Sequence, residues 1–263
     1  INTRDLRSIE RAEIPGEDIT VSIMESTYGG KSDYLPPVRE RDWILVQKIN
    51  ETLRRGGDVL IPVFAIGRSQ EVLLSLYQYY KSGALDLHNS EVIIEGKMLD
   101  KANRIYNRFN NRKLNFIGKK REPFHLVNYL NRQEYLEDGM RKIIVATSGM
   151  LTGGSAMEYI KYIAPNPMSS LIFVGYQAEE TLGHRILNEG LRNFMVDNEE
   201  VNLLPEVDHI SYSAHTYYPL TLKFLREIMP ERVIVNHGDP EKSCDLCAGI
   251  EKRLKIDALS PVN

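Results

Sequence analysis

The feature that most constrains the fold is a regular alternation of short apolar runs with amphipathic stretches. The apolar runs predict strands at DITVSIME (18–25), DVLIPVFA (58–65), EVIIEG (91–96), KIIVATSGM (142–150), SSLIFVGYQ (169–177) and RVIVNHG (232–238). Helical periodicity predicts helices over 39–57, 67–83, 97–110, 151–165, 181–193, 216–230 and 239–256. This order of elements predicts an α/β fold with a mostly parallel, Rossmann-like sheet.

The predicted strands are unevenly distributed along the chain. Residues 1–29 and residues 209–263 each contain too few strands to bury a sheet, whereas residues 30–208 contain enough for a core of their own. We therefore expect a central domain at 30–208 that is inserted between two parts of another domain, at 1–29 and 209–263.

Composition limits the class of protein. Of the 263 residues, 42% are hydrophobic and 26% charged, as in soluble globular proteins, and the net charge of −3 excludes a bulk basic surface. The sequence shows neither a signal-peptide core nor an apolar run long enough to span a membrane, so we expect a cytoplasmic protein without a membrane partner. The cysteines, Cys244 and Cys247, form a CxxC without a second such pair and are expected to be ordinary helix residues.

Polar residues and glycines gather where the predicted strands end. In parallel sheets, ligands bind at the carboxyl ends of the strands. The residues at these ends are Glu25, Arg68, Ser69, Ser148, Gly149, Tyr176, Gln177 and His237. This pattern locates a site without specifying its chemistry.

Two histidines and one glutamate are the strongest candidates for chemistry. His237 ends an apolar run, and His215 follows the small residues of SYSAHT. Neutral imidazole is a common zinc ligand and can also donate a proton, but two unrelated structural histidines would give the same pattern. Glu25 could bind a metal or orient a histidine ring, or it could cap the turn through the amides of Ser26 and Thr27.

Two turns could bind phosphate. GRSQE (67–71) places Arg68 and Ser69 at a predicted helix N-terminus, where free amides favour anions. TSGMLTGGSA (147–156) contains Ser148, Gly153 and Gly154, and its glycines would allow close backbone approach. The alternative for both is an ordinary strand-to-helix turn, since neither matches a nucleotide fingerprint.

The other histidines and the most basic stretch give weaker signals. His209 could face the same cleft as His215, whereas His184 is expected inside a helix and His88 and His125 carry no clear signal. GKKREPFH (118–125) is more typical of a solvated loop than of a nucleic-acid contact.

Six stretches in sequence order resemble one family. ESTYGG, IPVFAIGRSQE, ATSGMLTGGSA, VGYQAEETLG, SYSAHT and VNHGD are similar to the motifs of the β-CASP branch of the metallo-β-lactamase superfamily. The nearest kin by these motifs are the cleavage and polyadenylation specificity factor nucleases and their archaeal relatives. The resemblance implies a β-CASP domain inserted in a partly present αββα metallo-β-lactamase fold.

The resemblance also implies a function and its residues. It implies a zinc-dependent endoribonuclease, with possible 5′ to 3′ exonuclease activity, that acts in RNA 3′-end processing, termination or decay. Glu25 and His215 match the catalytic acid and histidine motifs, and His237 matches a ligand of a two-zinc site. Candidate RNA contacts are Arg68, Ser69, Ser148, Gly153, Gly154 and Ser213. RNA is the expected partner, together with a second copy of the chain or related subunits.

The chain departs from the family pattern at several points. The HxHxDH zinc motif is missing, so we expect the remaining ligands upstream of Ile1 in a longer protein, and we expect the chain alone to be inactive and to depend on a partner for stability. Tyr217 stands where relatives carry Asp, and Glu180 where they commonly carry Gly. A natural scaffold that has lost its nuclease half is the alternative.

Two classes of function remain open. The first is the ribonuclease. The second is a non-catalytic RNA-binding or complex-forming subunit, which would typically have lost part of the acid–histidine–histidine set that Glu25, His215 and His237 preserve. A small-molecule hydrolase is disfavoured because the inserted domain resembles a nucleic-acid module.

Overall fold

The computed structural model describes residues 1–109 and 113–261 and divides the chain into two compact units. The flanking unit consists of residues 1–36 and 213–263, and the central unit of residues 37–212. The expected boundaries, after residues 29 and 208, lie a few residues away from these. No helix of the described residues is long and apolar enough to cross a membrane.

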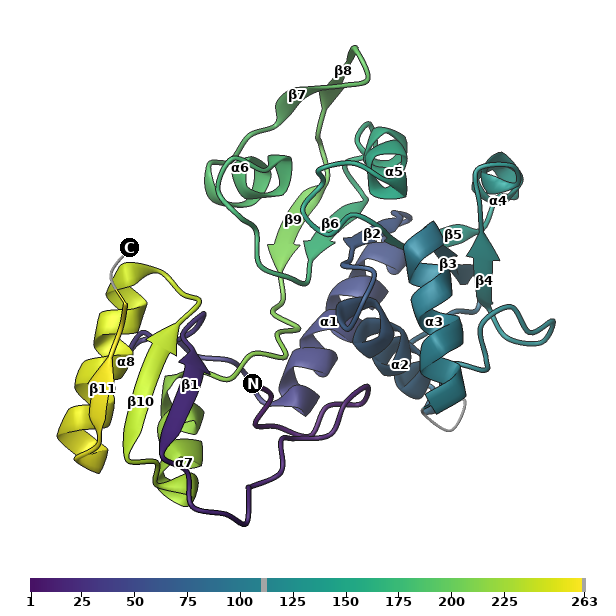
Figure 1. The fold of residues 1–263 in the computed structure, drawn as a ribbon. Helices are drawn as coiled ribbons and strands as arrows, with labels where there is room; N and C mark the ends of the chain where they lie inside the picture. The colour runs from purple at the N-terminus through teal and green to yellow at the C-terminus, as the bar shows by residue number, and fades with distance from the viewer. Residues whose placement is uncertain (110–112, 262–263) are drawn as a thin grey trace. The chain divides into compact units, whose positions relative to one another are not determined.

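The central unit is built on a six-stranded sheet in the order β4-β3-β5-β2-β6-β9, with all neighbouring strands parallel. The α/β expectation with a parallel sheet is therefore confirmed (Figure 1). The strands are β2 (Val59–Pro62), β3 (Ser90–Glu95), β4 (Phe124–Val127), β5 (Arg141–Ala146), β6 (Ser170–Phe173) and β9 (Glu206–His209).

Helices cover both faces of this sheet, which explains why its strands are apolar without alternation. On one face, Val59 and Ile61 pack with α1 (Val38–Arg54), α2 (Arg68–Lys81) and α3 (Lys97–Phe109). On the other, Leu60 packs with the second set of helices. This second set is α4 (Arg132–Glu137), α5 (Ser155–Ile163) and α6 (Leu182–Asn188). The predicted end of the third helix at 110 lies outside the described residues.

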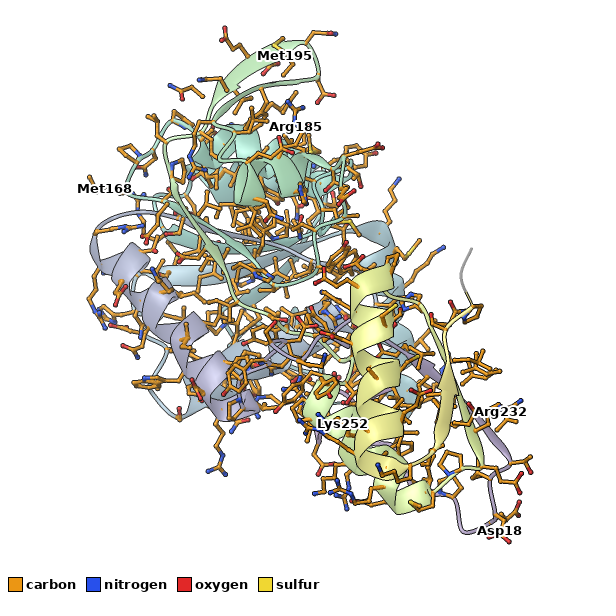
Figure 2. All side chains as sticks on the ribbon, turned by 90° about the vertical axis from the view of Figure 1, so that its left-hand side faces the viewer. Asp18, Met168, Arg185, Met195, Arg232 and Lys252 are labelled. Carbon is orange, nitrogen blue, oxygen red and sulfur yellow. The ribbon has the colours of Figure 1, made fainter. Side chains whose placement is uncertain are left out.

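A small antiparallel hairpin, β7 (Asn193–Val196) with β8 (Glu199–Asn202), extends from the central unit. Asp197 and Asn198 form its turn, both at positive φ as a type I′ turn requires. Figure 2 labels Met195 on this hairpin, where its side chain is exposed.

The flanking unit contains a three-stranded parallel sheet in the order β1-β10-β11. The strands are β1 (Val21–Glu25), β10 (Arg232–Asn236) and β11 (Asp257–Leu259), and the helices are α7 (Tyr218–Ile228) and α8 (Pro240–Leu254). Met24, Val233 and Val235 pack with the two helices on one face. Cys244 and Cys247 lie on α8 as free cysteines.

The other face of this small sheet is apolar and open. Ile23, Ile234 and Leu259 are matched across the three strands by the register, and Ile23 and Leu259 are exposed. Exposed apolar stripes of this kind mark a surface that another segment or partner covers. The flanking unit thus buries only one face of its sheet.

Some expected boundaries were wrong. The strand predicted over 18–25 begins only at Val21, and the stretch 118–125, expected as a loop, ends in β4, which starts at Phe124. The sequence reasoning also did not predict α4, β7, β8, β9 or β11. These elements are short, with six residues or fewer each, and so give weak periodic signals.

Candidate functional site

Three chemically competent side chains meet in the flanking unit. Glu25 ends β1, His215 lies in the segment before α7, and His237 follows β10. One ligand atom from each of these residues lies within 4.8 Å of the others, and they are the one such group of three or more among residues 1–109 and 113–261. The two imidazole rings are nearly parallel, with centroids 5.8 Å apart.

The parallel pairing of β1 with β10 explains why Glu25 and His237 are neighbours. Glu25 is in register with Asn236, so the two strands end at the same edge of the three-stranded sheet. A Cβ at Gly238 would lie 2.4 Å from the Ser26 carbonyl oxygen, so only glycine allows the turn after β10 to approach the turn after β1 this closely.

His237 itself adopts an unfavourable backbone conformation, with φ of +54°. Its N–H donates to the side chain of Asn236 over 2.8 Å, and its carbonyl accepts from the Ser26 N–H over 3.4 Å. Left-handed conformations of bulky residues persist where the surroundings enforce them and are concentrated at functional sites.

Glu25 is held as a charged hydrogen-bond acceptor. Its Oε1 lies 3.2 Å from His215 Nδ1 and accepts from the Thr216 N–H over 3.2 Å, while Oε2 accepts from the Thr27 N–H over 3.0 Å. Burial opposes ionisation, but the hydrogen bond and the charge of His215 outweigh it and hold the pKa of Glu25 well below its ordinary value. Two of the three roles considered for Glu25, orienting a histidine and capping a turn through Thr27, therefore have their contacts in the structure.

Thr27 is a residue that the sequence reasoning did not single out. Its hydroxyl lies 3.4 Å from His215 Nδ1 and 3.3 Å from His237 Nδ1, so it bridges the two rings. Among the described residues, the Nε2 atoms of these two histidines have no hydrogen-bond partner. The signal for Thr27 was its place directly after Glu25 and Ser26 in ESTYGG.

The donor set fits a metal ligand at His237 but not a complete metal site. The carboxylate of Glu25 already accepts hydrogen bonds on both oxygens, and His215 uses Nδ1 toward Glu25. The free imidazole nitrogens thus number two, whereas catalytic zinc sites use about three protein ligands. A zinc ion at His237 would need ligands beyond this group.

Ser213 supports the segment that carries His215. Its buried hydroxyl accepts from the His215 N–H over 3.1 Å, and its carbonyl accepts from the Arg4 guanidinium over 3.0 Å. The hydroxyl of Thr3 contacts that of Thr216 over 2.8 Å on the same segment. The structure therefore gives Ser213 a positioning contact, and its predicted phosphate contact stays a prediction.

The remaining predicted site residues lie at the carboxyl edge of the central sheet. Arg68 and Ser69 begin α2 after β2, and Ser148, Gly153 and Gly154 form the turn between β5 and α5. The strands β2 and β5 are adjacent, and a Cβ at Gly149 would lie 2.9 Å from the Phe64 nitrogen, so the two turns pack directly on each other. The sequence thus located one shared edge correctly.

Several polar groups of these turns are already used within them. The Ser69 hydroxyl donates to the Ala65 carbonyl over 2.9 Å, and the Ser69 N–H to the Phe64 carbonyl over 3.3 Å. The Ser148 hydroxyl accepts from the Thr152 N–H over 3.0 Å. Phosphate binding by these turns would depend on the half-buried Arg68 side chain and on the backbone near Gly153, where a Cβ would have no neighbouring atom within 4 Å.

The other histidines belong to the central unit. His209 ends β9 in the central unit and is exposed, and His184 lies in α6 as expected. His125, in β4, lies 3.2 Å from the Glu91 carboxylate. The contact between His125 and Glu91 is made within the central unit.

Comparison with known families gives two matches. Residues 69–186 match the Beta-Casp domain, and residues 200–261 match the Zn-dependent metallo-hydrolase RNA specificity domain. The first match lies inside the central unit, and the second includes the segments that carry His215 and His237.

Individual relatives are archaeal. The transcription termination factor FttA of Thermococcus kodakarensis is 36% identical over 261 residues, covering 92% of this chain and 39% of that protein. That of Methanothermobacter thermautotrophicus is 35% identical, covering 98% and 43%. An RNase J-like protein of Methanocaldococcus jannaschii is 34% identical, covering 100% of this chain and 62% of that protein. The chain spans about two fifths of the termination factors that it matches.

A solved structure of a protein of unknown function from Enterococcus faecalis V583 shares the fold. It matches with a TM-score of 0.50 at 10% identity, covering 94% of this chain and 51% of that one. At this identity the likeness concerns the fold alone.

Proposed function

This chain belongs to the β-CASP metallo-β-lactamase ribonuclease family, and from that premise we propose that it forms part of a zinc-dependent nuclease that hydrolyses RNA phosphodiester bonds. The observation that carries the proposal is the group formed by Glu25, His215 and His237 in the flanking unit. An RNA-binding subunit without activity would have no need for a charged, oriented pair beside a metal-ligand histidine.

His215 is the proton-transfer and charge-stabilising group of this proposal. Glu25 accepts from Nδ1 and so fixes the tautomer and the ring orientation, which leaves Nε2 to face substrate. In its protonated form the ring can stabilise negative charge on the phosphate or donate a proton to the departing ribose oxygen. Ser213, Thr27 and Thr216 hold the backbone and ring that this role requires.

His237 is the proposed zinc ligand from this chain. Two zinc ions, when bound, would supply an activated water and neutralise phosphate oxygens, with the remaining ligands coming from residues outside 1–263. The exposed apolar stripe at Ile23, Ile234 and Leu259 supports a flanking unit that another part of the protein covers. Residues 1–36 with 213–263 would then be part of a metallo-β-lactamase domain, with the central unit inserted in it.

The two turns at the carboxyl edge of the central sheet are the proposed phosphate contacts. Arg68 supplies charge, and the open backbone at Gly153, next to the closely packed Gly154, allows a strand to approach. Cleavage within the RNA, cytoplasmic action and assembly into a homodimer or with related subunits complete the proposal.

The test is RNA cleavage by the complete protein and by two matched histidine variants. His237→Ala is expected to lose cleavage by at least 100-fold, roughly the effect of removing a group that acts only in the transition state. The control, His209→Ala, removes an exposed histidine of the central unit and should keep wild-type activity. Equal activity of wild type and His237→Ala, or RNA binding without cleavage by the wild type, would favour the non-catalytic subunit instead.

A further inference from the structure

Within residues 37–109 and 113–212 of the central unit, helix α3 presents an exposed face. Leu99 and Asn103 bury the opposite face of the helix against the sheet. Four basic side chains, spaced by four, three and four residues, lie on one side of the exposed face. They are Lys97, Lys101, Arg104 and Arg108. These four residues are called the basic stripe.

An apolar row runs beside the basic stripe. It consists of Met98, Ile105 and Phe109, which are 64%, 60% and 78% exposed. Helical spacing of seven and four residues keeps the three on one side of α3. The basic stripe and the apolar row therefore lie side by side on a solvent-facing surface. Contiguous exposed apolar groups rimmed by polar residues mark interaction sites.

Most of the basic charge has no protein counter-charge. Asp100 is the one acidic residue of α3, and its carboxylate pairs with Arg104 over 2.8 Å. Among residues 1–109 and 113–261, no ion pair involves Lys97, Lys101 or Arg108. Three positive charges thus remain for an external anion.

A cavity opens at the first turn of α3. It has a volume of about 600 Å³ and is lined by the carboxyl ends of β3, β4 and β5, with Met98 and Arg104 on one side and Tyr129 on another. Tyr129 is 67% exposed. The basic stripe and this cavity therefore share residues and form one continuous surface.

The topology of the central sheet explains the cavity. From β3 the chain moves through α3 to β4, and from the adjacent β5 it moves through α5 to β6, in the opposite direction. The helices pack on opposite faces, as their core residues Leu99 and Tyr159 show. Such a divergence of connections leaves a crevice at the carboxyl ends of the strands, where α/β sheets bind ligands.

Two charged groups in the wall of the cavity, Glu95 and Arg132, are bound to each other. Arg132 donates to both oxygens of Glu95 over 3.0 and 2.7 Å, and the Tyr159 hydroxyl donates to Glu95 over 2.7 Å. This network fixes the wall and leaves it little net charge. A ligand group in the cavity would therefore be a neutral, flat group that stacks and forms hydrogen bonds, while its anionic part lies on the basic stripe.

We propose that the basic stripe and the cavity beside Tyr129 bind a short segment of single-stranded RNA. Phosphates lie along the stripe, which extends roughly 16 Å from Lys97 to Arg108 at the rise of an α-helix. One unpaired base enters the cavity and stacks on Tyr129. The proposal rests on RNA being the substrate class of the proposed function, but it concerns a surface of the central unit and uses none of Glu25, His215 or His237.

The combination of features favours RNA over an acidic protein. An acidic peptide would pair with the stripe through its carboxylates, but it would offer a flat group to the cavity beside Tyr129 only where it carries an aromatic side chain. A single strand offers both phosphates and bases at short intervals, which is how sequence-tolerant single-strand surfaces work. An acidic protein partner is therefore left as an outcome of the test.

The experiment measures binding of a fluorescent oligouridylate of about 15 nucleotides to the complete protein by anisotropy over a range of salt concentrations. Every protein carries His237→Ala, so that the probe stays intact. The test variant is Lys101→Gln with Arg108→Gln. The matched control is Lys223→Gln with Arg226→Gln, which removes the same exposed residue types from α7. Tyr129→Ala and Tyr129→Phe test the cavity.

The expected result is a weaker and less salt-dependent complex for the test variant. The slope of log affinity against log salt should fall by about 1.4, or about 0.7 for each lost phosphate contact, and should stay unchanged in the control. Tyr129→Ala should weaken binding by about 5-fold or more. Tyr129→Phe should bind with the affinity of the parent protein, because its ring still stacks.

Equal affinity and salt slope for the test variant and the parent would overturn the proposal, and a protein ligand for α3 would then be the better interpretation. Equal loss in the α7 control would also overturn it, because the effect would be bulk charge. Stripe-dependent binding in the His237→Ala proteins, together with no cleavage by the protein that retains His237, would sustain this surface while the proposed nuclease function failed.

Discussion

The two sheets of this chain differ in how many of their faces are buried. The six-stranded sheet of the central unit is covered on both faces, and its middle residues, such as Ile93 and Ile144, are fully buried. The three-stranded sheet of the flanking unit is covered on one face, and Ile23 on its other face is 72% exposed. The unit whose sheet is covered on both faces holds the proposed RNA surfaces, and the half-covered unit holds the group to which we assign catalysis.

The difference shows which proposed site is formed entirely by residues of this chain and which one lacks ligands. A surface formed by one unit can be tested on that unit's residues. The site at Glu25 and His237 lies at the end of the half-covered sheet and has too few metal ligands by itself.

The largest expected effect comes from the histidine to which we assign proton transfer. His215→Ala should lower the rate of RNA cleavage by about 100- to 10,000-fold, the usual contribution of a positioned acid or base. Single-turnover cleavage by the complete protein measures it. His184→Ala, in α6 of the central unit, is the control and should leave the rate unchanged. A similar loss in both variants would mean that His215 acts on stability alone.

The second prediction compares the two sheets directly. Ile93→Ala in the fully buried β3 should lower the free energy of unfolding of the central unit by about 2–5 kcal/mol. Ile23→Ala on the open face of β1 should change the stability of the chain of residues 1–263 by no more than about 0.5 kcal/mol. Denaturant unfolding of both variants measures this. Equal costs would contradict the difference between the sheets, because the face at Ile23 would then be covered within the chain itself.

The third prediction concerns two neighbouring glycines at the carboxyl edge of the central sheet. Both have positive φ, +146° at Gly153 and +73° at Gly154, but a Cβ at Gly154 would lie 2.6 Å from the Thr147 carbonyl oxygen. Gly154→Ala should therefore cost more stability than Gly153→Ala, by about 1 kcal/mol or more. Thermal unfolding ranks the two; the reverse order would show that the turn rearranges easily.

The smallest expected effect is a pH dependence in the central unit. Burial opposes ionisation of Glu91, but His125 and Lys142 outweigh it and hold its pKa below the ordinary value of 4.5. Since the folded pKa is the lower one, this carboxylate stabilises the unit above about pH 4.5, and the contribution is lost as the pH falls through the folded pKa. Glu91→Gln should give a shallower loss of stability below that pH. An unchanged pH profile would mean that other carboxylates dominate.

Much of the central unit could be predicted because its elements carry strong local signals. Continuous apolar runs such as 58–65 predict buried parallel strands, and the glycine-rich turns that follow them mark the carboxyl edge of the sheet. Glu25, His215 and His237 could also be chosen as candidate site residues from the sequence, since two of the three end apolar runs. Their proximity follows from the pairing of β1 with β10.

The missed features depend on distant partners. Arg41 and Asp42 belong to RERDW, which looks like the solvent face of a helix, yet both are fully buried. Arg41 pairs with Glu71 over 2.8 Å and lies 3.8 Å above the ring of Tyr212. No local pattern predicts a contact between residues 41 and 212. By contrast, the hairpin turn at Asp197 and Asn198 had a local signal that could have been recognised.

The most direct test of the central claim is the zinc content of the complete protein by elemental analysis, compared with His237→Ala and with the control His209→Ala. We predict about two zinc ions per chain in the wild type and the control, and a clear loss in His237→Ala. Zinc content that is the same in all three proteins, or no zinc in any of them, would contradict the claim that the half-covered unit contributes a ligand to a metal nuclease site.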